Sequence, residues 1–235
     1  MWRYSLTLLG AASLFLACQT KTYKGNTVIS GEIQGLKQGT IYIQQIKDSS
    51  LVLIDSMVVK GNSDFETSFD LDEPEVLYLS LNRGISQSLD NLILFFAEPG
   101  KMSIKSTLSN FSGGALIEGS ENQQLYNNYL EMRSAINNRH NELVKDHLLA
   151  QKNQQTVKAD SIEQAINRTG TRFYLNALNF VLKHNENEVA PYITLTDIAT
   201  VHHKHLDTIY NNLSPKVAKS KYGVILKNYM EMIKE

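Results

Sequence analysis

Cysteine is nearly absent from this chain of 235 residues, in which Cys18 is the only one. A single cysteine cannot form a disulfide within the chain, and the Cys-x-x-Cys pair that runs thiol–disulfide exchange is excluded. The chain therefore cannot carry out dithiol redox chemistry by itself.

An excess of charge of one sign is also missing. Lys and Arg number 23 against 24 Asp and Glu, which gives a net charge of −1, and only four prolines occur. A nucleic-acid-binding domain usually carries a basic patch, and recognition of anionic lipids uses a polybasic cluster, so we expect neither kind of surface. No fixed repeat and no low-complexity stretch is present, and we expect no cofactor.

Long hydrophobic runs are limited to one short segment near the N-terminus. Residues 5–17 carry no charge and follow a short basic start that contains Arg3. This run is shorter than the roughly 20 apolar residues that a membrane-spanning helix needs. The pattern predicts a cleaved signal peptide over residues 1–17.

Cys18 is the predicted lipidation site. Phe15-Leu16-Ala17-Cys18 resembles the bacterial lipobox, although Phe15 and Leu16 depart from its usual residues. Each buried CH₂ group of an acyl chain contributes about 0.8 kcal/mol, so several chains would hold the protein at a membrane. Residues 18–27 would then be a polar tether. We expect a cell-envelope protein anchored to the inner or outer membrane, facing the periplasm or the cell surface; the alternative is a secreted protein with a free cysteine.

Residues 28–119 have the pattern of a β-rich domain. Short β-branched or alternating segments recur with turns between them, which is typical of an antiparallel β-sandwich or barrel. The clearest turn is Glu98-Pro99-Gly100-Lys101, where Pro presets one central position and Gly allows a positive φ at the next. Residues 92–96 are apolar throughout, which predicts a central strand. Strands are expected at residues 28–33, 40–44, 51–59, 64–69, 75–81, 92–96, 102–106 and 115–118.

The hydrophobic period becomes helical after Gly119. Ser120 is a predicted N-cap, and Gln123 completes a capping-box pattern three residues later. Apolar stripes at helical spacing continue to the C-terminus, and each needs a partner surface. The predicted fold class is therefore α+β, with a helical region over residues 120–235. Aromatic residues on these stripes are interpreted as core: Tyr126, Tyr129, Phe173, Tyr174 and Phe180.

Five short segments together carry a resemblance to a known family. They lie at residues 53–65, 95–100, 117–122, 185–192 and 214–223, and the first three hold the Asp-Ser…Gly…Phe, Glu-Pro-Gly and Gly-Ser turn motifs. The chain resembles the domain of unknown function found at the front of many bacterial lipoproteins, ahead of a thioredoxin-like domain of the TlpA type.

This likeness covers about residues 28–233. In the family a redox domain with a Cys-x-x-Cys site usually follows, and this sequence has no such motif. The resemblance thus implies the non-catalytic part of such a protein, and a separate thioredoxin-like envelope protein as a partner.

A group of histidines is the only metal-like cluster in the sequence. On a helix, His202 and His205 share a face, with His203 and Asp207 close by, and neutral imidazoles bind zinc. A metal site needs three or four converging ligands, and only two are aligned here. We therefore interpret the cluster as a solvated helix face, expect no metal, and keep His202 and His205 as the remaining candidates.

No catalytic residue is expected. Asp55-Ser56 pairs a carboxylate with a hydroxyl, but no nucleophile-elbow motif surrounds it and no histidine base is indicated. We interpret the pair as capping or bulging a strand. The carboxylates of Glu98, Glu118 and Glu121 are dispersed near turns and indicate no paired-carboxylate chemistry.

Three hypotheses of function follow. The first is a non-catalytic cell-envelope lipoprotein that acts as a binding or scaffolding module. The second is an accessory subunit of a thiol–disulfide system, and the third is a metal-binding lipoprotein that uses the histidine cluster.

Overall fold

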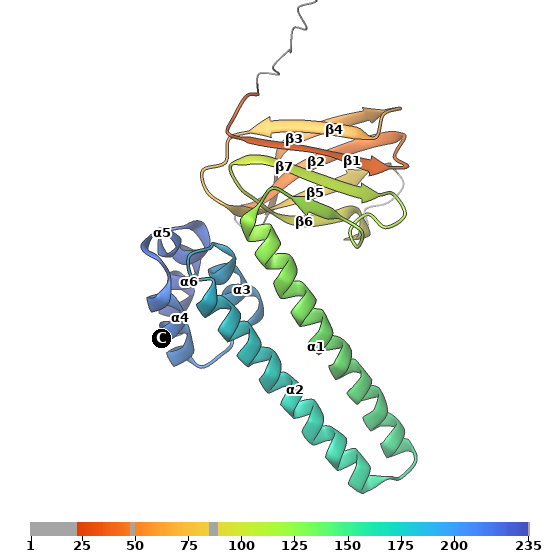
Figure 1. Ribbon diagram of the computed structural model, residues 1–235, viewed down its shortest axis with the longest axis vertical. Helices are drawn as coiled ribbons and strands as arrows, with labels where there is room; N and C mark the ends of the chain where they lie inside the picture. The colour runs from red at the N-terminus through yellow and green to blue at the C-terminus, as the bar shows by residue number, and fades with distance from the viewer. Residues whose placement is uncertain (1–22, 48–49, 85–88, 235) are drawn as a thin grey trace, which may run out of the picture.

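Two layers of β-sheet stand at one end of this protein, and helices fill the other end (Figure 1). The computed structural model describes residues 23–47, 50–84 and 89–234. The predicted signal peptide, Cys18 and most of the predicted tether lie outside these residues. Within the described ranges, no helix combines the length and apolar character needed to cross a bilayer.

The strands form two four-stranded sheets. The first sheet has the order β4 (Asp64–Phe69), β1 (Thr27–Gln34), β7 (Gly100–Thr107), β8 (Leu116–Glu118). The second sheet has the order β3 (Ser50–Lys60), β2 (Gln38–Lys47), β5 (Glu75–Asn82), β6 (Leu92–Ala97), with the short helix η1 (Leu89–Asn91) before β6. The sheets pack face to face and are not closed into a barrel, so the sandwich alternative is the one observed.

The sandwich core comes from side chains that alternate along the strands. Ile29 and Ile33 of β1, Ile41 of β2, and Leu77 and Leu79 of β5 are almost fully buried between the sheets. Successive side chains of a strand point to opposite faces, so the intervening residues of β5 face away from this core. Of these, Val76 and Tyr78 pack against the helices, as described below.

One strand pair differs from the antiparallel expectation. β1 runs antiparallel to β4 but parallel to β7, with Thr27 opposite Gly100. The predicted turn before Gly100 is present, and this glycine has φ +133°. The turn links β6 of the second sheet to β7 of the first, so it changes sheets rather than closing a hairpin. Turn residues mark where a strand ends, but they do not determine which sheet the next strand joins.

The prediction that residues 92–96 form a central strand is wrong. β6 is an edge strand. Its residues are apolar on both faces because Ile93 and Phe95 fill the sandwich core, whereas Leu94 and Phe96 pack against the helices. Burial of both faces therefore reflects a covering helical layer and not a central position in the sheet.

The helices are α1 (Glu121–Lys152), α2 (Thr156–Lys183), α3 (Val189–Asp197), α4 (His203–Asn212), α5 (Pro215–Ala218) and α6 (Lys221–Met232). α1 and α2 form a hairpin that extends away from the sandwich, and α3 to α6 gather beside its base (Figure 1). At 1.5 Å per residue, α1 is about 48 Å long. The predicted change from strands to helices is confirmed, because β8 ends at Glu118 and α1 begins at Glu121. Gly119 between them has φ +94°, and Ser120 Oγ accepts a hydrogen bond from Gln123 N at 3.0 Å.

The capping box predicted for α1 is only half formed. Ser120 caps the helix, but the side chain of Gln123 does not return to Ser120 N. Its Oε1 atom accepts from Phe96 N at 2.6 Å, and its Nε2 atom donates to Asn127 Oδ1 at 2.7 Å. The N–H of Phe96, which has no partner strand among the described residues, thus bonds to the side chain of Gln123, and this bond joins α1 to β6.

Candidate functional site

An aromatic cluster joins the outer face of the second sheet to the helices. Phe96 of β6 meets Tyr126, Tyr192 and Tyr222 edge-on, with ring centroids 6.2, 5.3 and 5.9 Å away. Tyr192 and Tyr222 also meet each other at 5.1 Å. Aromatic pairs prefer such edge-to-face geometry, so three helices are packed around one phenylalanine of the sandwich.

Side chains from the helices also satisfy backbone donors of the second sheet. Val76 and Phe96 face each other across β5 and β6. Val76 N donates to the hydroxyl of Tyr222 at 2.8 Å, and Phe96 N donates to Gln123 Oε1 at 2.6 Å. In a non-hydrogen-bonded antiparallel pair both N–H groups point outward, which leaves each free for a helix residue. Because buried N–H groups must be paired, these bonds fix the helices on the sheet.

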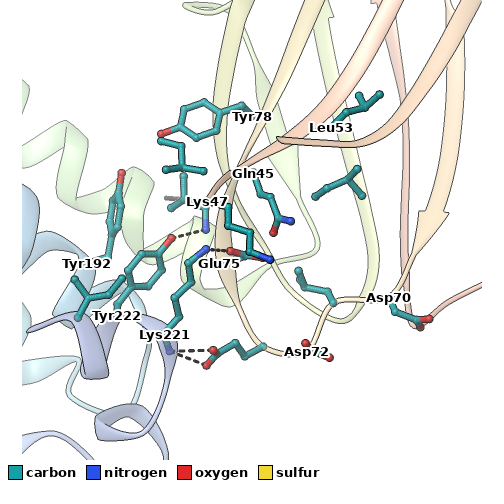
Figure 2. A pocket seen from close by; sticks show the side chains of 16 residues that line it. Gln45, Lys47, Leu53, Asp70, Asp72, Glu75, Tyr78, Tyr192, Lys221 and Tyr222 are labelled. Carbon is teal, nitrogen blue, oxygen red and sulfur yellow. Dashed lines mark hydrogen bonds and ion pairs between the residues drawn. The ribbon is translucent and has the colours of Figure 1, made fainter. Parts of the chain in front are cut away.

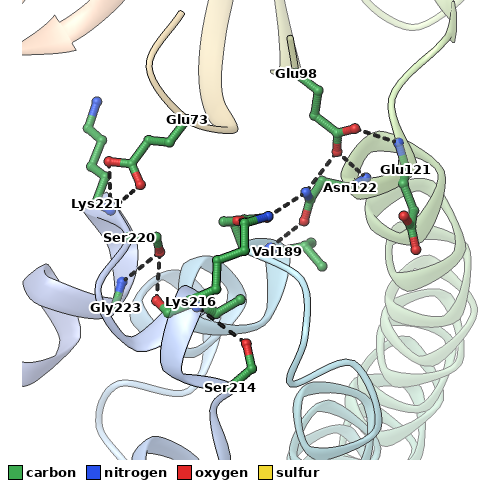
Figure 3. A network of polar contacts seen from close by, with 12 residues as sticks. Glu73, Glu98, Glu121, Asn122, Val189, Ser214, Lys216, Ser220, Lys221 and Gly223 are labelled. Atoms are coloured by element: carbon green, nitrogen blue, oxygen red, sulfur yellow. Dashed lines mark hydrogen bonds and ion pairs between the residues drawn. The ribbon is translucent and has the colours of Figure 1, made fainter. Parts of the chain in front are cut away.

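A polar network ties the start of α1 to α3 and α5 (Figure 3). Glu98 accepts from Glu121 N at 3.1 Å and from Asn122 N at 2.7 Å, so a carboxylate occupies the positive end of α1. Asn122 donates to Glu188 Oε2 at 3.0 Å and accepts from Val189 N at 2.7 Å. Glu188 is also 3.1 Å from Lys216 Nζ. The carboxylate of Glu98 therefore holds the start of α1 against the end of β6.

Lys221, the first residue of α6, binds the loop before β5 and the first residue of β5. Its backbone N donates to both carboxylate oxygens of Glu73 at 2.9 Å, and its Nζ atom pairs with Glu75 (Figures 2 and 3). A carboxylate at a helix N-terminus is favoured by the helix dipole. The sandwich and α6 are thereby held together at a second point.

Between these contacts a cleft of about 870 Å³ remains open (Figure 2). The β2–β5 ladder ends at the pair Gln45–Leu77, so Ile46 and Lys47 separate from the start of β5. A β-bulge between Ile43 and Gln44 shifts the β2–β3 register at the same place, leaving Ile54 without a partner residue. Bulges bend a strand and redirect its side chains, and here the bend coincides with the opening of the cleft.

We call this space the junction cleft, and its lining has three parts. The first is apolar, with Ile46, Leu53 and Ile54 from the β2–β3 hairpin, Leu71, Val76, and Ile225 of α6. The second consists of the tyrosines Tyr78, Tyr192 and Tyr222. The third is polar, with Gln45, the carboxylates Asp70, Asp72, Glu73 and Glu75, and the lysines Lys47 and Lys221.

Some charged side chains of the junction cleft have partners in the described part of the chain and others do not. Four carboxylates face two lysines, and Lys221 is engaged by Glu75. Asp70 accepts from Asn26 N at 3.1 Å, whereas exposed Asp72 has no ion-pair partner among the described residues. The rim of the cleft near Asp70 and Asp72 is therefore acidic.

The tyrosines of the junction cleft are held neutral. Burial is the main cause that raises the pKa of Tyr78, Tyr192 and Tyr222 above the ordinary value of 10.0, and the carboxylate of Glu75 adds to the increase in the pKa of Tyr222. These phenols offer apolar ring faces and hydroxyl hydrogen bonds, but no anionic base near neutral pH.

The histidine candidates do not converge with a third ligand. His202 caps α4 by accepting from Lys204 N at 3.2 Å, and its ring centroid lies 6.5 Å from that of His205. His203 turns to Asp207, with Nδ1 2.9 Å from Oδ2. In residues 23–47, 50–84 and 89–234 no group of three or more His, Cys, Asp and Glu side chains could hold a metal ion.

The other predicted candidates have structural roles. Asp55 accepts hydrogen bonds from Thr67 Oγ1 of β4 and from Ser56 N, the latter at 2.8 Å, so it links β3 to the first sheet. Glu118 accepts from Ser103 Oγ at 3.3 Å. Tyr129, predicted as core, is fully buried, and its hydroxyl donates to Asp197 at 2.6 Å.

Sequence reasoning missed the junction cleft. Its residues come from 45–78 and from 192–225, where the sequence carries turn motifs and a histidine cluster but no motif that marks a ligand site. The one local sign was the second face of β5, where Val76 and Tyr78 alternate with core leucines. That alternation indicated that the outer face of β5 is covered, but it did not indicate that helices α3 and α6 cover it.

Comparison with known proteins identifies part of the chain. Residues 27–126 match the family model described as "Domain of unknown function (DUF4369)". The match runs from β1 into the start of α1, and the predicted likeness to a domain of unknown function is confirmed there. No curated protein and no solved structure matches the chain. The junction cleft thus combines the matched domain with helices that lie beyond the match.

Proposed function

We propose that this protein is a non-catalytic binding module of the cell envelope, anchored through lipidated Cys18, and that the junction cleft is its ligand site. The observation that carries the proposal is the cleft itself, an open space of about 870 Å³ between two regions that are otherwise joined by buried hydrogen bonds. Ligand sites are concave, mostly apolar and largely preformed, with a few fixed polar groups. The lining of this cleft has that character.

The chemistry of the lining supports binding rather than catalysis. Its described residues include no histidine, serine, threonine or cysteine, which are among the common nucleophiles and bases. Glu73 and Glu75 are already engaged by Lys221. The tyrosines are protonated at neutral pH, and burial raises the pKa of Tyr192 and Tyr222 further above the ordinary 10.0. These groups can orient a ligand but are poorly placed to exchange protons with it.

Site-specific photocross-linking in intact cells tests this proposal. A photoreactive residue at Ile225, which lines the cleft and is 43% exposed, is compared with one at Val224, which is 45% exposed and does not line it. On β3, a photoreactive residue at Leu53, which lines the cleft, is compared with one at Val58, which does not. We expect one ligand to be captured from Ile225 and Leu53 and not from the two controls.

Equal capture from all four positions, or none from any, would contradict a ligand site in the cleft. A captured protein that carries a Cys-x-x-Cys motif would favour the accessory role in a thiol–disulfide system. Loss of membrane association in a Cys18→Ala variant tests the anchor separately.

A further inference from the structure

We infer that the ligand of the junction cleft is an extended polypeptide segment in which apolar side chains alternate with lysine or arginine. The segment binds along the free edge of β3, next to Leu53 and Ile54. This inference rests on the proposed function of the cleft and names its ligand class. Three independent features of the described residues carry it: a free strand edge, an apolar wall and an acidic rim.

The free edge lies at the end of β3 that borders the cleft. β3 is an edge strand and pairs with β2 on one side only. Proteins usually protect such edges with charge, proline or a covering element. Here Leu51, Val52 and Leu53 are exposed, and no charge lies between Ser50 and Ile54. Backbone groups of an exposed edge can bind the main chain of an added strand.

The bulge brings side chains of this edge into the cleft. Leu53 and Ile54 are neighbours, and in a regular strand they would point to opposite faces. Because the register shift leaves Ile54 without a partner on β2, both residues line the cleft. Ile225 of α6 is exposed among the same lining residues. A strand beside β3 would direct alternate side chains towards this apolar wall.

The acidic rim selects the charge of the segment. Asp70 and Asp72 lie in the lining with Glu73 and Glu75, and Lys221 is already engaged by Glu75. The lining holds four carboxylates against Lys47 and Lys221, so its net charge is negative. An acidic segment would find only Lys47 to pair with, whereas a basic one would pair with Asp72. Charge of this kind sets specificity and the rate of association. Strand pairing, apolar contact and positive charge together describe a basic, alternating peptide.

Peptide binding to the full chain in a non-ionic detergent tests the inference. The probe is fluorescein-labelled Lys-Val-Lys-Leu-Lys-Val-Lys, and the controls are its Glu-for-Lys counterpart and a version with alternate backbone N-methyl groups. We expect binding of the first peptide only. Hydrogen exchange should slow at those amides of Ser50–Ile54 that point away from β2, because strand addition pairs them.

Two protein variants with matched controls locate the contact. Asp72→Lys should weaken binding of the basic probe by about fivefold or more at low salt, and Leu53→Ser by about fivefold through lost apolar contact. Asp160→Lys on α2 and Val58→Ser on β3 both lie outside the cleft lining. They should leave the affinity within about twofold of the parent. Circular dichroism verifies that every variant is folded.

Equal binding of the acidic probe, unchanged affinity in Asp72→Lys, or unprotected β3 amides would overturn the inference. So would cross-linking at Ile225 and Leu53 that captures a lipid, a glycan or a second copy of this chain, although the cleft would then remain a binding site. If those positions capture nothing in cells and no probe binds, the proposed function fails as well.

Discussion

Tyr222→Phe is the most informative single substitution at the junction, because it removes one hydrogen bond and leaves the ring in place. The hydroxyl of Tyr222 accepts from Val76 N at 2.8 Å in a buried setting. The ring contacts with Phe96 and Tyr192, at 5.9 and 5.1 Å, do not need the oxygen. The variant therefore isolates the contribution of the acceptor.

The expected loss follows from the buried donor left behind. An unsatisfied buried N–H costs about 1–3 kcal/mol, so the free energy of unfolding should fall by that amount. The next residue along, Leu77, pairs with Gln45 on β2, but Val76 lies beyond the last pair of that ladder. No strand partner among the described residues can replace the phenol.

Urea denaturation followed by far-ultraviolet circular dichroism measures the change. Tyr78→Phe is the matched control, because Tyr78 also lines the cleft and its hydroxyl makes no hydrogen bond within the described part of the chain. That control should change the free energy of unfolding by less than about 0.5 kcal/mol. Equal effects of the two variants would refute the claim that Tyr222 holds α6 on the sheet.

Three further predictions concern the anchor, alkaline pH and metal. Cys18→Ala should move the protein from the membrane to the soluble fraction after cell fractionation, because the acyl chains supply the anchoring free energy; an unchanged distribution would contradict lipidation. Burial raises the pKa of Tyr192 and Tyr222 in the folded state, so their protons are held more tightly there. The free energy of unfolding should stay level below about pH 10 and fall above it, as measured by urea denaturation at about pH 8 and about pH 11; a level profile would argue against the buried phenols. Zinc titration by calorimetry should give no binding that His202→Ala or His205→Ala abolishes, since the pair lacks a third described ligand; a zinc site lost in both variants would revive the metal hypothesis.

Local features of the sequence predicted the local features of the fold. Strand segments, the turn at Gly100 and the cap at Ser120 depend on residues that are neighbours in the chain, and the structure confirms each. Strand order and direction depend on which surfaces meet, so the parallel β1–β7 pair and the edge position of β6 were not predicted.

The junction cleft was beyond prediction for the same reason. The bond from Val76 N to Tyr222 joins residues 146 positions apart. Gln123 had a sound local partner in Ser120, but the unpaired N–H of Phe96 engages its side chain instead. Which hydrogen bond such a side chain makes depends on which buried N–H groups lack a partner, and that is settled only in the assembled fold.

Native mass spectrometry of the full chain released gently from its membranes tests the central claim most directly. The comparison is between the parent protein, Ile225→Lys in the cleft lining, and Val224→Lys, the equally exposed neighbour outside it. We expect a bound mass that the parent and Val224→Lys retain and that Ile225→Lys loses. A bound mass that all three retain, or that none carries, would contradict a ligand site in the junction cleft.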